Sequence, residues 1–303
     1  MIVNVQHRWE MHCHSRFSDG RLSPEALLAE AQAKGVEHLA LTDHDTARGY
    51  RYAVDQQLVP PGLTLYPGAE MSCLWHGRTL HIVGLGMDVY SDTWLAVEAD
   101  LDQRRRRRFD RIIELLVRAG FELDVEQILQ RAEFGVPARP HIADYLVETG
   151  QVSSLGSVYK RWLGQGKVGD VKQQWPELGE TIDAIHRSGG MAVLAHPHRY
   201  KLTWTKAREL LDDFTDAGGE AVEIACAGLH PDLRKFLVNQ ARERHLWVGG
   251  GSDFHGPEQK WISLGRYPSW PLDVPLVQDW LANQNAPVQS AVQAGNCSAV
   301  GLK

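Results

Sequence analysis

The sequence predicts an α/β protein in which parallel strands form a closed or nearly closed barrel. Seven short apolar runs recur along the chain, each followed by polar residues and a turn, and several are separated by helix-like patterns. Strand and helix patterns that alternate in this way predict a parallel sheet, and seven strands favour a barrel over an open sheet. The predicted strands are Trp9–His14, His38–Asp43, Leu63–Glu70, Leu80–Gly86, Met191–Ala195, Ala221–Ala225 and Leu246–Gly250.

Helices are predicted between several of these strands. The first has Ser23 as its N-cap, Pro24 at its first helical position and Gly35 at its end, which is the residue usage expected of helix boundaries. Two more are predicted at residues 181–188 and 231–245.

The stretch from about residue 92 to 178 breaks the alternation and predicts a helical insertion between the fourth and fifth strands. Its predicted helices are Trp94–Ala119, Val125–Arg131, His141–Thr149 and Ser154–Leu163. The expected organisation is a barrel domain made of residues 1–91 and 179–282, an insertion domain over 92–178 and a C-terminal tail over 283–303.

Five consecutive arginines, Arg104–Arg108, fall inside the first helix of the insertion. Consecutive residues of a helix point in all directions, so the run cannot form a single stripe. Two interpretations stay open: a solvated helix with partly paired charges, or an anion-attracting rim near a cleft.

Composition limits the class of protein. Apolar residues are 43% of the 303-residue chain, enough for a sizeable core, and the net charge of −6 argues against a broad nucleic-acid groove. A local anion pocket remains compatible with that charge. The N-terminus does not resemble an export signal, no long apolar run predicts a membrane helix, and no CxxC pair is present. We therefore expect reduced cysteines and a cytoplasmic location.

Histidines and carboxylates gather where the predicted strands end. His12 and His14 share one face of the first strand, since alternate residues of a strand point the same way, and Asp253 with His255 repeats that spacing. In a (β/α) barrel these strand ends open on one face, which carries the active site. The candidate metal ligands are His12, His14, Asp19, His44, Glu70, His81, His196, Asp253 and His255.

Each of these residues alone has an ordinary structural explanation, such as a helix cap, a turn or a core histidine. Together they would crowd several carboxylates at one barrel mouth, and divalent cations would offset the repulsion. Imidazole and carboxylate ligands suit zinc, manganese or iron better than calcium. Nine ligands exceed the need of one ion, so two or three ions with Glu70 as a bridge are expected.

These residues lie in motifs that resemble those of the PHP family (polymerase and histidinol phosphatase). The motifs are HxHxxxSDG at residues 12–20, TDHDT at 42–46, the glutamate of PGAE at 67–70, AHP at 195–197 and SDFH at 252–255. The resemblance covers nearly the whole chain and implies a distorted (β/α)7 TIM-like barrel, here with a helical insertion.

The resemblance also implies how the ligands divide among the ions. His12, His14, Glu70 and Asp253 would hold one metal, Glu70, His81 and His196 a second, and Asp19, His44 and His255 a third. We expect two or three divalent ions, with Mn²⁺ favoured and Zn²⁺ or Fe²⁺ as alternatives.

Further stretches resemble one bacterial branch of this family, which removes the 3′-phosphate of nucleoside 3′,5′-bisphosphates and is also described as a 5′-to-3′ exoribonuclease. They are HIVGLGMD at 81–88, ARPHIADYLVETG at 138–150, YKRWLGQGK at 159–167, SGGMAVLAHPHRY at 188–200 and the strand before SDFH. The expected partners are a nucleoside 3′,5′-bisphosphate such as pAp and short 5′-phosphorylated RNA, with no membrane and an open oligomeric state.

The expected mechanism is attack by a metal-bridged hydroxide on the phosphorus, with cations spreading the charge of the transition state. Arg199 is the main catalytic candidate, and His198 is a second, at a position where the branch has a small residue. Arg139, His141 and Lys167, together with Arg199, are the expected substrate-binding residues, with the first three gripping the 5′-phosphate.

Two rival functions share the metal site. One is a phosphomonoesterase of the histidinol-phosphatase type, and the other is a metal-binding domain without catalysis. A third alternative is a protein that binds long RNA, but the acidic net charge argues against it.

Overall fold

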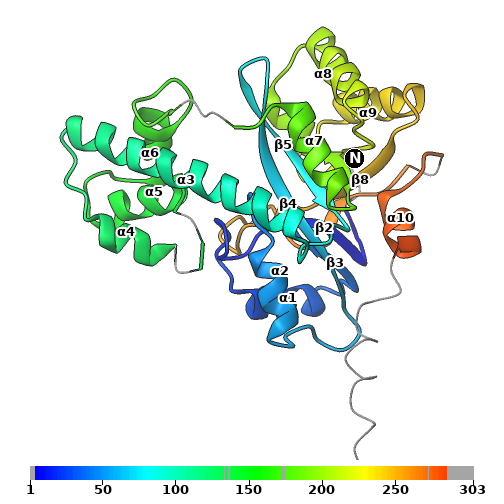
Figure 1. The fold of residues 1–303 in the computed structure, drawn as a ribbon, viewed down its shortest axis with the longest axis horizontal. Helices are drawn as coiled ribbons and strands as arrows, with labels where there is room; N and C mark the ends of the chain where they lie inside the picture. The colour runs from blue at the N-terminus through cyan, green and yellow to red at the C-terminus, as the bar shows by residue number, and fades with distance from the viewer. Residues whose placement is uncertain (1–3, 133, 136, 172–174, 272, 285–303) are drawn as a thin grey trace, which may run out of the picture.

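The seven predicted strands form one sheet, whose spatial order is the order of the strands along the chain. The structure is a computed structural model that describes residues 4–132, 134–135, 137–171, 175–271 and 273–284. The strands are β2 (Trp9–Cys13), β3 (His38–Leu41), β4 (Thr64–Trp75), β5 (Arg78–Leu85), β6 (Met191–Leu194), β7 (Ala221–Cys226) and β8 (Trp247–Gly251). Figure 1 shows the helices that surround them.

The sheet curls so that its first and last strands meet. Cys13, at the end of β2, forms a parallel bridge with Phe254, which follows β8. The amide of Asp253 donates to the carbonyl of His12 over 2.8 Å, and the amide of His14 donates to that of Phe254 over 2.9 Å. The nearly closed barrel is therefore confirmed, and the segment after β8 meets the end of β2 beside His12 and His14.

The expectation of an all-parallel sheet is wrong at β5, which runs antiparallel to both β4 and β6. The reason is a tight connection: Trp75 of β4 pairs with Arg78 of β5, so only His76 and Gly77 join the two strands, and both have positive φ. A hairpin this short can join only antiparallel strands, because a parallel pair needs a long crossover.

This hairpin changes two expectations about the site. Glu70 does not end its strand, since β4 continues for five more residues to Trp75. His81 lies in the first half of β5, yet the reversed direction puts it opposite Ser72, at the barrel end where the parallel strands finish.

The three helices predicted around the barrel are present as α1 (Pro24–Ala33), α7 (Leu178–Arg187) and α9 (Pro231–Glu243). Sequence patterns did not reveal α2 (Arg48–Asp55), α8 (Trp204–Asp216) or α10 (Val277–Gln284). They also did not reveal the small sheet in which β1 (Asn4–Gln6) pairs with β9 (Arg266–Pro268), because its three-residue strands are far apart in the chain. The predicted tail from residue 285 onward lies outside the described residues.

The insertion consists of α3 (Asp92–Arg118), α4 (Val125–Arg131), α5 (Arg139–Glu148), α6 (Leu155–Val158) and the π-helical turn η1 (Tyr159–Leu163). Phe109, Ile112 and Ile142 belong to a separate apolar cluster of these helices. Trp94 and Leu101, near the start of α3, instead pack in the core of the barrel. Figure 1 shows α3 running from the outlying helices to the sheet, so one long helix links both parts.

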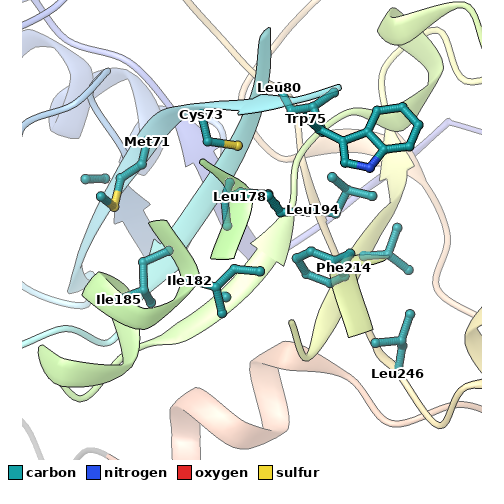
Figure 2. Packing of buried hydrophobic residues seen from close by; sticks show 14 of the residues in the cluster. Met71, Cys73, Trp75, Leu80, Leu178, Ile182, Ile185, Leu194, Phe214 and Leu246 are labelled. Atoms are coloured by element: carbon teal, nitrogen blue, oxygen red, sulfur yellow. The ribbon is translucent and has the colours of Figure 1, made fainter. Parts of the chain in front are cut away.

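The largest apolar cluster lies between the sheet and the helices that cover it. Met71, Cys73 and Trp75 alternate along β4 and pack with Ile182 of α7 and Leu194 of β6, among others, as Figure 2 shows. Since neighbouring strand residues face opposite sides, Glu70 and Ser72 face the barrel interior. The core therefore fixes which face of β4 carries the polar residues.

The described cysteines, Cys13, Cys73 and Cys226, are buried and free, and Cys297 lies outside the described residues. Within the described part of the chain, none of the helices has both the length and the apolar character that crossing a membrane requires.

Candidate metal centre

Glu70 is the centre of a buried cluster of imidazoles at the barrel mouth. Its Oε2 lies 3.3 Å from Nε2 of His12, 3.2 Å from Nε2 of His14 and 3.1 Å from Nδ1 of His44. A backbone bridge between His44 and Glu70 extends the β3–β4 pairing past the end of β3. One carboxylate oxygen thus faces three ring nitrogens that come from two different strand ends.

The other oxygen of Glu70 faces a second pair of histidines. Oε1 lies 2.8 Å from Nδ1 of His81 and 2.7 Å from Nε2 of His196, and these two nitrogens are 3.4 Å apart. The antiparallel direction of β5 is what brings His81 to this place. Glu70 therefore has the position of a bridging ligand between two groups.

Asp253 and Asp19 complete the cluster on opposite sides. Oδ1 of Asp253 is 3.6 Å from Nε2 of His12 and 3.3 Å from Nε2 of His14. Oδ1 of Asp19 is 3.3 Å from Nε2 of His255, and its Oδ2 is 3.9 Å from Nε2 of His44.

Distances place these side chains in three overlapping groups at the barrel mouth. Within each group the ligand atoms lie within 4.8 Å of one another. The groups are His12–His14–Glu70–Asp253, His44–Glu70–His81, and His14–Asp19–His44–His255. The first group equals an expected ligand set, and the third contains another together with His14. His196 joins the second through its contacts with Glu70 and His81, so the structure brings all nine expected residues together.

Several atoms of this cluster are buried without a hydrogen-bond partner among the described residues. They are Nε2 of His12 and His14, Nδ1 of His44, Oδ1 of Asp19, Oε2 of Glu70 and Oδ1 of Asp253. Buried polar atoms are nearly always hydrogen-bonded, so orphaned ones require an explanation. Here they converge on shared spaces and are typical metal ligands, which fits divalent metal binding.

The carboxylate of Glu70 and the imidazole of His14 are each stabilised in the charged form by neighbours of opposite charge. Burial opposes ionisation of Glu70, but His44, His81 and His12 outweigh it and hold the pKa of this carboxyl well below its usual range. Burial likewise opposes protonation of His14, yet Asp253 and Glu70 raise its pKa to about 10. Since a metal ligand must be a neutral imidazole, cations and protons compete for this site.

Glu223 of β7 is an outer partner that sequence reasoning missed. Its Oε1 lies 2.7 Å from Nδ1 of His12, and its Oε2 accepts from the amide of His196 over 2.6 Å. A carboxylate behind a ligating histidine fixes the orientation of the ring. The available signal was a single charge inside the otherwise apolar run AVEIAC.

Glu10 is a second missed carboxylate, and it lies where the barrel closes. Oε1 accepts from the amide of Ser252, and Oε2 accepts from that of Gly265, each over 2.8 Å. Complete burial raises the pKa of Glu10 to about 7. This side chain ties β2 to the segment that carries Asp253.

Two of the nine residues have strained backbones. His196 has φ of 29° and Asp253 has φ of 54°, in a region that residues other than glycine rarely adopt. Such strain concentrates at functional sites, where the surrounding structure holds it in place.

The two catalytic candidates differ in position. Arg199, in the 3-10 turn η2 (Pro197–Tyr200), places its guanidinium 2.6 Å from Oδ2 of Asp253. His198 instead lines an apolar cavity with Leu202 and Leu233, and burial lowers its pKa to about 4. The structure thus brings Arg199, but not His198, into contact with the cluster.

The expected substrate-binding residues lie in the insertion. Arg139 begins α5 and donates to the carbonyl of Leu163 over 3.2 Å. Nδ1 of His141 accepts from the amide of Ala138, and its ring lines a polar pocket together with Asp19. Lys167 is exposed in the turn that follows η1.

A buried cluster of histidines and carboxylates at the mouth of a seven-stranded barrel is the arrangement of a metal-dependent hydrolase. The PHP domain family matches residues 10–224, and the chain belongs to this family. It is a hydrolase, as are the curated relatives that it matches.

Two curated relatives cover most of the chain. The 5′-3′ exoribonuclease Rnm of Escherichia coli is 40% identical over 280 residues, which are 91% of this chain and 95% of the relative. The 3′,5′-nucleoside bisphosphate phosphatase of Chromobacterium violaceum is 35% identical over 269 residues, which are 86% of this chain and 92% of the relative.

Solved structures share the fold. A Chromobacterium violaceum protein described as an amidohydrolase, with bound sulfate and no metal, has a TM-score of 0.82 and 31% identity over 91% of this chain and 96% of its own. A Bifidobacterium adolescentis protein, provisionally assigned as a metal-dependent phosphoesterase, has a TM-score of 0.78 and 25% identity over 95% of this chain and 99% of its own.

Proposed function

We propose that this protein hydrolyses the 3′-phosphate of nucleoside 3′,5′-bisphosphates, and that it also trims short 5′-phosphorylated RNA from the 5′ end. The observation that carries the proposal is the cluster around Glu70, in which the nine expected ligands are all present and in contact. Relatives that cover most of the chain are named for these two activities. The two reactions are chemically continuous, because each breaks the bond between phosphorus and a ribose 3′ oxygen.

The cofactors in this proposal are two or three divalent ions held by the nine residues, with Mn²⁺ favoured over Zn²⁺ and Fe²⁺. When bound, such ions polarise phosphoryl oxygens and make water a stronger nucleophile. Glu70 supplies one oxygen to each of two ligand groups.

The chain's own groups have two tasks around the ions. Glu223 orients the ring of His12 through Nδ1 and fixes the backbone of His196 by accepting from its amide. The Arg199 guanidinium lies next to Asp253, and its charge stabilises the negative charge that develops on the phosphoryl oxygens. Because the Glu223 carboxylate and the Arg199 guanidinium are already in place, they need no rearrangement during the reaction.

We propose further that the chain divides into the barrel of residues 1–91 and 179–282 and the insertion of 92–178, and that it acts in the cytoplasm. The separate apolar cluster of the insertion supports the division. The free buried cysteines Cys13, Cys73 and Cys226 support a reducing compartment.

The decisive assay measures phosphate release by the Mn²⁺-loaded protein from adenosine 3′,5′-bisphosphate, beside 3′-AMP, 5′-AMP and histidinol phosphate. We expect fast release from the bisphosphate only. Preference for histidinol phosphate would keep the metal centre and replace the substrate. Absence of turnover with every ester would favour a metal-binding domain without catalysis.

A second assay addresses RNA. A short oligoribonucleotide with a 5′-phosphate should be shortened stepwise to mononucleotides, and the same oligonucleotide with a 5′-hydroxyl should be shortened slowly. Internal cleavage of both would contradict the proposed direction.

A further inference from the structure

A second group of potential metal ligands lies where the tip of the β4–β5 hairpin meets α8. His76 belongs to the two-residue turn of the hairpin, and it faces Glu209 and Asp213. Ligand atoms from the three side chains all lie within 4.8 Å of one another. Glu209 and Asp213 are four residues apart in α8, so they share one face of the helix. Two elements that are far apart in the chain thus supply an imidazole and two carboxylates to one place.

The distances within this group suit a zinc ion. Nδ1 of His76 is 3.3 Å from Oε1 of Glu209, and its Nε2 is 3.7 Å from Oδ2 of Asp213. Zinc binds imidazole nitrogen and carboxylate oxygen at about 2.0–2.2 Å in a tetrahedral arrangement, which puts neighbouring ligand atoms about 3.3–3.6 Å apart. Since one ring nitrogen binds the ion, rotation of the partly exposed carboxylates is enough to complete three ligands. The fourth position is left for water.

Trp75 holds two of the three ligands in position. Its indole Nε1 donates to Oδ2 of Asp213 over 2.7 Å. Its ring stacks on that of His76, with 4.6 Å between the centroids and 18° between the planes. Trp75 itself is buried in the core of the barrel. Contacts behind the ligands fix the orientation of carboxylates and imidazoles at metal sites, so this group is partly organised before an ion arrives.

The charge of the group favours a cation. Nζ of Lys206 lies 2.7 Å from the carboxylate of Glu209, whereas Asp213 accepts from the neutral indole of Trp75. Among the described residues, two carboxylates thus face one ammonium group, and one negative charge is in excess when the imidazole is neutral. The side chain of Lys206 is half-exposed, and surface ion pairs of this kind contribute little to stability. A divalent ion can therefore displace the ammonium group.

The group is separate from the candidate metal centre. Along the hairpin, the pair formed by Trp75 and Arg78 is three residues from the pair formed by Ser72 and His81, which corresponds to about 10 Å. The same two strands carry Glu70 and His81. An ion between the hairpin tip and α8 would therefore stabilise the hairpin that positions these two residues.

We propose that His76, Glu209 and Asp213 form a structural zinc site that fastens the β4–β5 hairpin to α8. The site is additional to the ions at the barrel mouth and independent of the reaction proposed there. It joins parts of the chain that are 138 positions apart at Trp75 and Asp213. Because the unfolded chain does not hold the three ligands together, zinc binding stabilises the folded state.

The test measures bound zinc by equilibrium dialysis against a series of free-zinc concentrations, followed by atomic spectroscopy. At saturation we expect the His76→Asn protein to bind one zinc ion fewer than the wild type. Asparagine tolerates the positive φ of His76 but lacks the imidazole. His245→Asn is the matched control, because His245 is also an exposed histidine with positive φ. This control should bind as many zinc ions as the wild type.

Asp213→Asn provides a second variant that leaves the hairpin turn intact. Its amide oxygen can still accept from Trp75, while the charge that binds the ion is lost. We expect it to bind one zinc ion fewer as well. Equal zinc content in the wild type, His76→Asn and Asp213→Asn would overturn the site and leave only an ion pair between a protonated histidine and α8. A matching loss in His245→Asn would also overturn it.

Discussion

At the scale of single residues, the candidate metal centre depends on side chains whose polar atoms each contact a different partner. His12 has Nε2 toward Glu70 and Asp253 and Nδ1 toward Glu223. Its ring is completely buried. Glu70 and Asp253 keep their negative charge because the surrounding imidazoles lower the pKa of each carboxyl against the effect of burial.

Removal of a candidate ligand should abolish turnover. For His12→Ala or Asp253→Ala we expect phosphate release to fall by more than about 100-fold, since even outer partners of metal ligands contribute 10- to 100-fold. Bound metal, measured by atomic spectroscopy, should fall in parallel. His186→Ala, which changes an exposed histidine of α7, serves as the control. Full activity in either ligand variant would remove the metal model.

Glu223 should affect metal binding through the two histidines that it contacts. Glu223→Gln keeps the shape of the side chain but removes the charge behind His12 and the second acceptor oxygen. We expect the affinity for Mn²⁺ to fall about 10- to 100-fold, and competition with a fluorescent chelator would measure it. Glu243→Gln changes an exposed glutamate of α9 and should leave the affinity as it is. Unaltered affinity in Glu223→Gln would mean that the carboxylate only fills space.

At the scale of elements, the closure of the barrel and the reversed strand position the ligands. β8 approaches β2 so closely that a Cβ on Gly251 would lie 2.6 Å from the amide nitrogen of His12 and 2.4 Å from Oε1 of Glu10. The β4–β5 hairpin brings His81 to the same end as the strands that run the other way. The first contact joins segments that are distant in the chain, and the second depends on a hairpin of neighbouring residues.

Gly251→Ala should separate β8 from β2. We expect the free energy of unfolding to fall by about 1–3 kcal/mol, the usual cost of an overpacked core, and metal binding to weaken because His12 and Asp253 move apart. Chemical denaturation and a metal titration would measure the two effects. Gly179→Ala is the control, because no atom lies within 4 Å of the added methyl group and alanine suits the first turn of α7. Equal stability of both variants would contradict the close contact.

At the scale of the whole molecule, stability, pH and metal binding are linked. In the metal-free protein the folded state raises the pKa of His14 to about 10, above the value near 6.5 of an unfolded chain. This group therefore adds stability below pH 6.5, and that contribution is lost as the pH rises toward 10. Bound cations require the neutral ring, so their contribution has the opposite dependence on pH.

Thermal unfolding should show this reversal. With a chelator present, we expect the melting temperature to decrease between about pH 7 and pH 9, because the folded protein still holds a proton on His14 that the unfolded chain has released. With excess Mn²⁺ it should instead increase over the same range, because fewer protons compete with the metal. Parallel curves with and without metal would show that the cluster does not bind Mn²⁺.

The sequence by itself determined the seven strands, the helical insertion and the gathering of the nine candidate ligands. Local patterns carry this information: apolar runs of strand length, the i,i+2 spacing of His12 with His14, and helix boundaries such as Ser23 and Gly35. Such features depend on residues that are close together in the chain, so they can be recognised without the folded structure.

Only the tertiary structure decided which partners meet across the chain. The contact of Glu223 with His12 and that of Glu10 with Gly265 join residues that are 211 and 255 positions apart. A glutamate in an apolar strand has no local sequence pattern that indicates its partner. Burial selects these partners, because a charge withdrawn from water must find its counterpart through the fold.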